Sequence, residues 1–175
     1  YGNRLRNSPE EWYRYDAQGH RITAQRHNGP GVASIYSLAG QLVYDEDALP
    51  GARRSDSYFY LGGRLIAQKM WHWDTNQTTV EFRHADYQGT RMADSGSAGQ
   101  MLRRQFWQPY GQPVDNPAFD GLGYTGHKVD AATGLIYMQQ RYYDPQIGRF
   151  LSVDPVAAYE KPMTNFNRYV YALNN

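Results

Sequence analysis

The sequence has no cysteine in its 175 residues, which excludes disulfide frameworks, thiol nucleophiles and cysteine-ligated zinc. It also has no excess of charge of either sign, because 18 lysine and arginine residues stand against 17 aspartate and glutamate residues. A formal net charge of +1 gives no long-range attraction for nucleic acid or an anionic membrane. No apolar run reaches the roughly 18 residues of a membrane helix. We therefore expect neither a nucleic-acid partner nor a membrane span.

Familiar catalytic and cofactor signatures are missing as well. There is no GxSxG elbow, no GxxxxGK[ST] loop and no GxGxxG turn, so serine hydrolase and nucleotide-binding functions have no support. The histidines lack a close ligand spacing such as HxxH or HExxH, and they are His20, His27, His72, His84 and His127. We expect no metal and no cofactor, and structural hydrogen bonds at His72 and His84.

Tyrosine is what the chain has in abundance, with 16 tyrosines against 6 phenylalanines. A tyrosine buries a large ring and keeps a polar tip, so the low mean hydropathy of −0.78 hides apolar area that can form a core. Charged residues are only 20% of the chain, which is not the composition of a disordered segment. The chain is expected to fold, as one domain or as a section of something larger.

A loose internal repeat is the most informative feature of the first half. Its copies are Tyr15–Ile22, Tyr36–Val43, the shortened Tyr60–Ile66 and the looser Asp86–Met92. Each copy has a turn between two alternating runs, and the turn residues are Asp16, Gly19, Gly40, Gly63 and Gly89. Glycine supplies the positive φ that such turns need. Each copy therefore predicts a β-hairpin.

The strands between these turns carry aromatic residues at even spacing. Tyr13 with Tyr15, Tyr58 with Tyr60 and Trp71 with Trp73 would each share one face of a strand. Helical periodicity is weak, and 17 glycines and 9 prolines interrupt most windows. We predict an all-β fold in which antiparallel hairpin repeats pair side by side into a curved strip that ends in a compact domain.

The aromatic face admits two interpretations. Arginine stacks well on tyrosine, so the alternation of these residues is typical of cross-strand structure. The other interpretation is an aromatic platform that binds carbohydrate or RNA. We favour the structural one and keep a carbohydrate-binding β-module as the alternative function.

The repeat gives way after residue 94. We predict hairpin repeats over 1–94, a transition of hairpin and loop over 95–120, and a compact core domain over 121–175 that is incomplete at its C-terminus. The stretch from Ser95 to Gly99 is a polar hairpin tip or a short linker, and Pro109 to Asp120 is a loop by composition.

The last third carries the most distinctive pattern. Residues 134–155 resemble the Rhs-repeat-associated core domain, whose pattern is GLxYxxxRYYDPxxGRFxxxDP, and Asn167–Asn175 matches the NxYxYxxNN that follows it. The core-motif residues with an expected structural role are Tyr142, Tyr143, Pro145, Gly148, Arg149, Phe150 and Pro155. The hairpin units resemble the YD repeats of the same Rhs proteins.

This resemblance implies the closing part of a hollow shell. In Rhs proteins, in the C components of insecticidal toxin complexes and more distantly in teneurins, YD repeats wind into a cocoon, which in bacteria encloses a variable C-terminal toxin. The implied partners are the rest of the shell and its toxin, with an immunity protein, a secretion spike or a chaperone as further candidates. The implied location is the bacterial cytoplasm before export, followed by secretion or delivery into a target cell, as with type VI secretion effectors in interbacterial competition.

The resemblance also implies self-cleavage of an aspartyl-protease type, which frees the toxin inside the shell. Asp154 matches a family residue needed for cleavage, and Arg141 matches an arginine beside it that would hold a carboxylate ionised. Asp144 is a weaker catalytic candidate, because Asp144-Pro145 also predicts a turn closed by Gly148. Catalysis and an Asp-Pro turn remain open alternatives for Asp154.

Two departures from the family pattern bear on activity. The family usually has a glycine two residues after the proline of the Asp-Pro pair, and Ala157 stands at that position here. The sequence also ends before the family's downstream segment, which contains the scissile bond. We therefore expect no self-cleavage of this chain alone, and we expect a missing neighbour at its N-terminal strip edge.

Overall fold

Nine strands form one antiparallel sheet, which we call the strip, and each pairs with the strand next to it in sequence. They are β1 (Glu11–Tyr15), β2 (Arg21–Arg26), β3 (Val32–Tyr36), β4 (Leu42–Asp47), β5 (Arg54–Leu61), β6 (Arg64–His72), β7 (Gln77–Ala85), β8 (Arg91–Gly96) and β9 (Met101–Arg104). The computed structural model describes residues 4–154 and 168–172. Side-by-side pairing gives every inner strand two neighbours, which removes the edges of the single hairpins.

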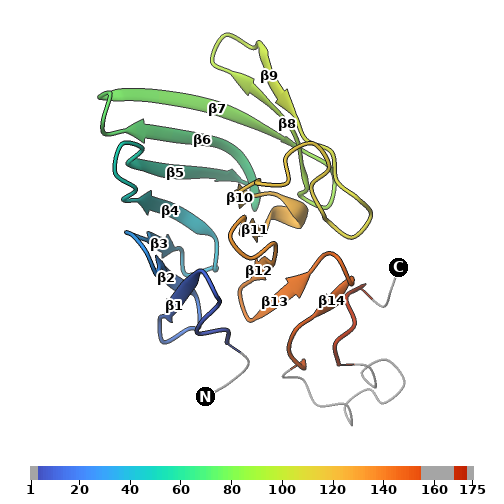
Figure 1. The fold of residues 1–175 in the computed structure, drawn as a ribbon. Coiled ribbons are helices and arrows are strands. Elements are labelled where there is room, and N and C mark those ends of the chain that lie inside the picture. The colour runs from blue at the N-terminus through green and yellow to red at the C-terminus, as the bar shows by residue number, and fades with distance from the viewer. Residues whose placement is uncertain (1–3, 155–167, 173–175) are drawn as a thin grey trace.

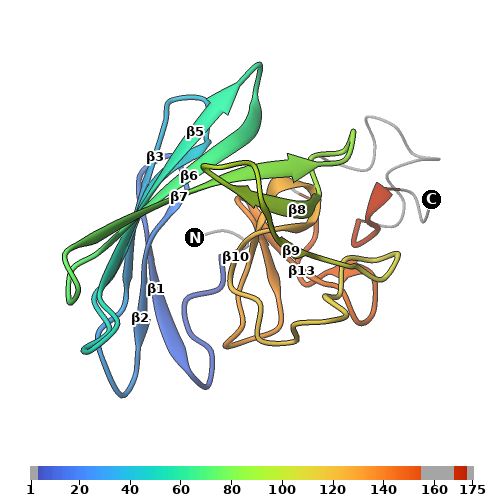
Figure 2. The same ribbon diagram turned by 90° about the horizontal axis from the view of Figure 1, so that it is seen from above.

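A second antiparallel sheet of five short strands, the closing sheet, follows in the chain. It consists of β10 (Gly121–Leu122), β11 (Lys128–Val129), β12 (Ile136–Met138), β13 (Arg141–Asp144) and β14 (Arg149–Phe150). One 3-10 turn, η1 (Tyr124–Gly126), lies between β10 and β11. The closing sheet lies beside the inner face of the strip, within its curve (Figures 1 and 2). The prediction of an all-β antiparallel fold is confirmed.

All four predicted hairpins are present, as the pairs β1–β2, β3–β4, β5–β6 and β7–β8. In the first of them, the amide of Asp16 donates to the carbonyl of His20 at 3.0 Å, and the amide of Gly19 donates to the carbonyl of Asp16 at 3.2 Å. The carboxylate of Asp16 also accepts from the amide of His20 at 2.8 Å. Gly19 has a φ of +97°, which explains why glycine stands at this point of the turn.

The same five-residue turn recurs in two further copies of the repeat and in three segments where the sequence showed no repeat. Its two backbone hydrogen bonds are found again in the segments 37–41, 86–90, 96–100, 108–112 and 123–127. The fourth residue is always a glycine with positive φ, and the last three of these are Gly99, Gly111 and Gly126. The transition region and the closing sheet therefore reuse the turn of the repeats.

A β-bulge interrupts each of the four hairpins just before its turn. The register shifts fall at Arg14/Tyr15, Ile35/Tyr36, Phe59/Tyr60 and His84/Ala85. A bulge increases the local twist and bends the strand. The four bulges stand at equivalent positions, so successive hairpins share this local bend.

The expectation of a single aromatic face is wrong, because the buried face of the strip is largely polar. Ser34, Asp45 and Asp56 are successive cross-strand partners, and each is less than 9% exposed. Tyr13 and Tyr58 are buried, but Tyr44 lies opposite the exposed Ile35 on the other face. Alternation fixes which residues share a face but not which face is covered.

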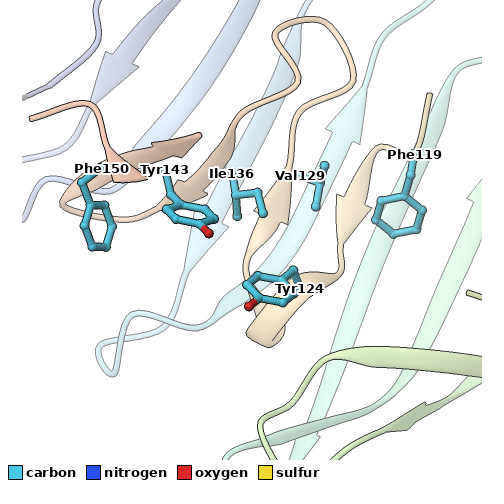
Figure 3. Packing of buried hydrophobic residues seen from close by; sticks show 6 residues of the cluster. All are labelled: Phe119, Tyr124, Val129, Ile136, Tyr143 and Phe150. Atoms are coloured by element: carbon cyan, nitrogen blue, oxygen red, sulfur yellow. The ribbon is translucent and has the colours of Figure 1, made fainter. Parts of the chain in front are cut away.

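The main hydrophobic core belongs to the closing sheet (Figure 3). It consists of Phe119, Tyr124, Val129, Ile136, Tyr143 and Phe150, with Trp107, Met138 and Tyr171 packed against it. The hydroxyl groups of Tyr124 and Tyr143 donate to the carbonyl groups of Pro109 and Tyr110, both at 3.0 Å. Tyrosine can serve as core here because its polar tip reaches the 109–110 loop.

Candidate functional site

A fully buried ion pair joins the strip to the closing sheet. The guanidinium of Arg21, on β2, donates from Nη2 to Oδ1 of Asp130 at 2.7 Å and from Nη1 to Oδ2 of the same carboxylate. Nη1 also donates to the hydroxyl of Tyr142 at 3.1 Å. Burial alone would lower the pKa of Arg21, but Asp130 outweighs it and raises the pKa. The pair is a bidentate contact that fixes the position of one sheet on the other.

Aromatic rings enclose this guanidinium on two sides. Its central carbon lies 4.7 Å from the centre of the Tyr137 ring and 5.0 Å from that of Tyr13. The backbone amide of Arg21 donates to the hydroxyl of Tyr137 at 2.7 Å. Arginine–tyrosine stacking is thus structural at this site, as the favoured interpretation of the sequence predicted.

A second buried ion pair lies two strands away. The ammonium group of Lys128, on β11, donates to Oδ2 of Asp45 on β4 at 2.6 Å. The hydroxyl of Ser34 donates to the other oxygen of this carboxylate. Burial would lower the pKa of Lys128, but Asp45 and Asp120 outweigh that effect and raise it. Both ion pairs therefore hold charged side chains of the strip and the closing sheet together.

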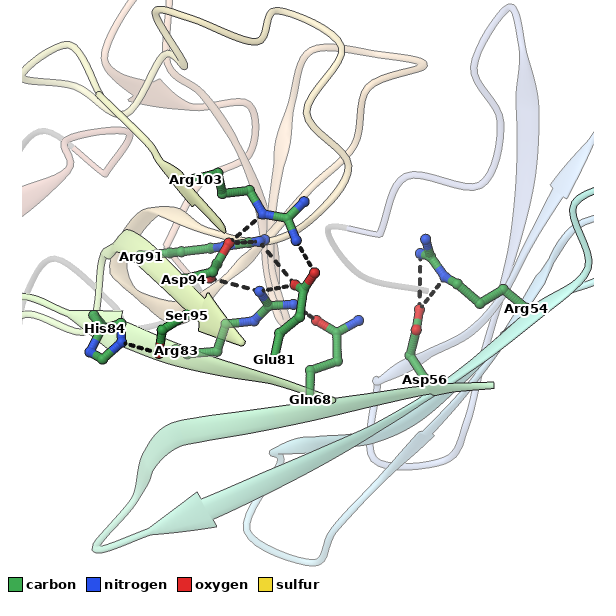
Figure 4. A network of polar contacts seen from close by, with 10 residues as sticks. All are labelled: Arg54, Asp56, Gln68, Glu81, Arg83, His84, Arg91, Asp94, Ser95 and Arg103. Atoms are coloured by element: carbon green, nitrogen blue, oxygen red, sulfur yellow. Dashed lines mark hydrogen bonds and ion pairs between the residues drawn. The ribbon is translucent and has the colours of Figure 1, made fainter. Parts of the chain in front are cut away.

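Farther along the strip, β7, β8 and β9 carry a cluster of arginines and carboxylates (Figure 4). Asp94 is wholly buried, and its carboxylate accepts from Nε of Arg91 at 2.9 Å and from Nε of Arg103 at 2.7 Å. Nη1 of Arg83 lies 2.7 Å from both Asp94 and Glu81. The cluster borders a polar cavity of about 430 Å³ between the strip and the loop that precedes β10.

The structure brings Arg141 and Asp154 together, as the family resemblance implied. Nη2 of Arg141, on β13, lies 2.9 Å from Oδ2 of Asp154. The guanidinium carbon lies 3.5 Å from the centre of the Phe150 ring, and Nη1 is buried without a hydrogen-bond partner in the described part of the chain. Burial lowers the pKa of Arg141, although Asp154 opposes that effect.

Backbone contacts hold Asp154 in place from the far side of the undescribed segment 155–167. The amide of Asp154 donates to the carbonyl of Arg168 at 2.9 Å, and Nε of Arg168 donates back to the carbonyl of Asp154 at 3.0 Å. Arg141 thus contacts the carboxylate of Asp154, and Arg168 holds the backbone of Asp154.

Asp144 forms the turn that the sequence predicted as the alternative to catalysis. Its carboxylate accepts from the amide of Gln146 at 2.8 Å, and Gly148 closes the turn with a φ of +64°. Pro145 is buried within this turn. The arrangement is an Asx turn that links β13 to β14.

The two adjacent tyrosines of the motif point to opposite sides of β13. Tyr142 faces the strip, where its hydroxyl lies 3.2 Å from that of Tyr15. Tyr143 is wholly buried in the core, and its ring centre lies 4.6 Å from that of Tyr171, with the two rings tilted by 41°. Arg149 and Phe150 pair with the C-terminal stretch, through a bridge from Arg149 to Val170 and a hydrogen bond from the amide of Phe150 to the carbonyl of Tyr169 at 3.0 Å. Pro155 lies outside the described residues.

The four residues of the two buried ion pairs were missed by the sequence analysis. Asp45, Lys128 and Asp130 lie outside the repeat turns and the core motif, and Arg21 follows a turn in the same way as other repeat residues do. Partners 83 and 109 residues apart leave no local spacing signal. The only hint is the unusual presence of charge at inward-facing strand positions.

The structural hydrogen bond expected at His84 lies within the described part of the chain. There, His84 makes a structural contact of 2.8 Å from Nε2 to the hydroxyl of Ser95 (Figure 4). No three His, Asp or Glu side chains of residues 4–154 and 168–172 gather as a possible metal site. No helix in those ranges is long and apolar enough to cross a membrane.

The chain thus combines a sequentially paired β-strip that has a charged inner face with a small aromatic sheet fastened into the curve of that strip. The family model described as Teneurin YD-shell matches residues 6–175, and the chain belongs to this family. The Rhs and YD-repeat resemblance of the sequence is thereby confirmed.

Several proteins of known name are similar to this chain. The tRNA nuclease WapA of Bacillus subtilis is 29% identical over 97% of this chain and 7% of that protein. Toxin subunit YenC1 of Yersinia entomophaga is 29% identical over 85% of this chain and 17% of that protein. Toxin protein Tse5 of Pseudomonas aeruginosa is 33% identical over 56% of this chain. The chain thus spans only a small fraction of the length of these relatives.

The fold also matches a solved structure. The Tc holotoxin pore of Photorhabdus luminescens contains a chain that superposes with a TM-score of 0.71 and 21% identity, over 98% of this chain and 9% of that one. An identity this low establishes the shared fold and nothing more.

Proposed function

We propose that this chain is the closing section of a shell that surrounds a C-terminal toxin and helps to release it. The observation that carries the proposal is the pair of buried ionic contacts, Arg21–Asp130 and Lys128–Asp45, which fix the closing sheet inside the curve of the strip. A sheet held there would block the end of a longer strip. The toxin names of several relatives support this role.

The proposal includes partners, location and domain boundaries. The partners are the remaining turns of the shell and the toxin within, with an immunity protein, a secretion spike or a chaperone as further candidates. The protein would be made in a bacterial cytoplasm and then secreted or delivered to a target cell. We keep the division into 1–94, 95–120 and 121–175 as a proposal, noting that the strip itself continues through β9.

Protection of the enclosed domain from protease tests the shell. In the longer protein, the region after this chain should resist a protease that digests it readily when it is expressed alone. Replacing Arg21 and Lys128 together by methionine should loosen the closing sheet and abolish the protection. Equal digestion of the enclosed and the isolated domain would contradict the proposal.

We further propose that Asp154 acts in self-cleavage and that Arg141 orients its carboxylate, with support from their 2.9 Å contact and from the family motif. In a chain extended through its natural downstream segment, Asp154→Asn should stop cleavage, and Arg141→Met should slow it. Asp144→Asn is the matched control, because asparagine keeps the Asx turn and should leave cleavage intact. Mass spectrometry of the products measures cleavage in all three variants. Cleavage that persists in the Asp154→Asn variant would refute the assignment.

A further inference from the structure

A pocket of about 270 Å³ lies between the turns of the strip and the loop that follows β10. The turns at Gly40, Gly63 and Gly89 line one wall, and the loop from Leu122 to Lys128 lines the other. Successive turns are tied together, because Nε2 of Gln41 donates to the carbonyl of Gly63 at 3.4 Å. In the same way Nη2 of Arg64 donates to the carbonyl of Tyr87 at 3.2 Å. The wall is therefore a connected row rather than three independent loops.

Thr125, on the opposite wall, has a strained backbone. Its φ is +47°, which is rare for a β-branched residue. The five sister turns of the chain provide an internal comparison, since their residues at the same position, Gln18, Ala39, Gln88, Ala98 and Tyr110, do not have positive φ. Strain of this kind amounts to about 1 to 3 kcal/mol and gathers at functional sites. The turn that lines the pocket is thus the one that departs from the shared geometry.

Three polar groups of the lining have no hydrogen-bond partner in the described part of the chain. The hydroxyl of Thr125 is buried and unpaired. The hydroxyl of Tyr36 and the imidazole of His127 also make no side-chain hydrogen bond there, and burial lowers the pKa of His127, so that its ring is neutral at pH 7. Unpaired polar groups among the residues that line one pocket indicate a site for a ligand with matching groups.

The charges of the lining narrow the class of ligand. No aspartate or glutamate lines the pocket. Arg83, Arg91 and Lys128 are paired with carboxylates outside it, and only Arg64 carries a charge without a carboxylate partner in the described residues. A strongly charged ligand would therefore find little compensation inside.

Aromatic rings, amides and aliphatic side chains make up most of the remaining lining. The rings are Tyr36, Tyr60, Tyr87 and Tyr137, the amides are Gln41, Gln88 and Gln139, and the leucines are Leu42, Leu65 and Leu122. From this lining we propose that the pocket binds a neutral saccharide unit, whose hydroxyl groups donate and accept as the unpaired groups require. The site differs from the aromatic strand face considered in the sequence analysis, because it is built by turns and by the closing loop. It is independent of the shell function.

Titration of the whole chain with glucose, galactose, mannose and N-acetylglucosamine tests the proposal, with binding followed by NMR chemical shifts and by calorimetry. At least one sugar should give saturable shifts at the tyrosines of the lining. Tyr36→Phe keeps the ring and removes the hydroxyl, and it should weaken binding about threefold to tenfold.

Thr125→Gly is the decisive variant, since glycine relieves the positive φ. It should maintain or raise the melting temperature while it weakens binding, so that misfolding cannot explain the loss. Trp73→Ala, in the exposed turn after β6 and outside the pocket lining, is the control and should leave affinity unchanged. Absence of saturable binding by all four sugars, or binding that depends on Trp73 and not on Thr125 and Tyr36, would overturn the proposal.

Discussion

At the scale of single residues, Arg21 shows why this protein tolerates so much buried charge. Its side chain is 3% exposed, and it meets a carboxylate, the hydroxyl group of Tyr142 and the aromatic faces of Tyr13 and Tyr137. Burying a charge is costly unless its partners replace the lost water. Here every partner is supplied by protein, from strands that are distant in sequence.

Arg21→Met should destabilise the protein by about 3 to 5 kcal/mol, because Asp130 would remain as an uncompensated buried charge. The midpoint of urea unfolding measures the effect. Arg26→Met is the matched control on the same strand, and it should lose less than about 1 kcal/mol because its pair with Asp47 is partly exposed. A double variant, Arg21→Met with Asp130→Leu, should recover much of the loss, and failure to recover would point to the aromatic contacts instead.

Asp94 should make stability depend on pH in the acid range. Burial raises the pKa of this carboxyl, but hydrogen bonds and charge from Arg91 and Arg83 outweigh burial, so the folded pKa lies below its usual value near 3.9. Its contribution is then fully present above about pH 4 and is lost as pH falls through the folded pKa. The Asp94→Asn variant should have a lower melting temperature than the unmodified protein at pH 7. Its melting temperature should also fall less steeply as the pH drops below 4. Parallel declines for the two proteins would contradict this.

At the scale of elements, the turns explain how one small pattern builds most of the molecule. The same two backbone hydrogen bonds and the same glycine recur six times, in the strip, in the transition and in the closing sheet. These turns depend on neighbouring residues alone, so a sequence can reveal them. The bulge in each of the four repeat hairpins has no sequence mark.

Two glycines with different environments test what the turns require. Gly63→Ala should lower the free energy of unfolding by about 1 to 2 kcal/mol, because the φ of Gly63 is +81°. The added Cβ itself would meet no atom within 4 Å. Gly31→Ala should lose more, although its φ is ordinary, because a Cβ would lie 2.2 Å from the carbonyl oxygen of Ala24. Equilibrium unfolding of both variants decides the order, and the reverse order would show that backbone strain dominates over steric overlap.

The sequence predicted the hairpins and the Asp144 turn because each depends on residues close together in the chain. It placed Asp154 beside Arg141 only through the family resemblance, since the two are 13 positions apart with no pattern that joins them. It could not predict the pairs of Asp45 with Lys128 or Arg21 with Asp130, which arise from the packing of two sheets. The polar inner face was missed because alternation does not say which face is covered.

At the scale of the whole molecule, the two sheets are held by contacts that do not require an unbroken chain. Residues 114–118 between the sheets are exposed. Trp107 and Phe119, on either side of them, pack with their ring centres 5.3 Å apart. Together with the two buried ion pairs, this packing should keep the parts associated after a cut.

Cleavage at a protease site inserted between Asp115 and Asn116 should therefore leave two fragments that elute together in size-exclusion chromatography. They should separate in urea. The same cut in a variant with Arg21→Met and Lys128→Met should release the closing sheet without denaturant. Separation of the fragments in the unmodified background would show that the linking chain holds the sheets together.

The order of strands in the strip has a consequence for synthesis on the ribosome. Since strand order equals chain order, each hairpin can pair with its predecessor as soon as it emerges. Arg21, however, waits for Asp130, which is made 109 residues later. At about 5 to 20 residues per second, that interval is roughly 5 to 20 s. The growing strip therefore spends many seconds with its inner face open to water, and a face rich in charge keeps such an unfinished protein from aggregating before its last sheet arrives.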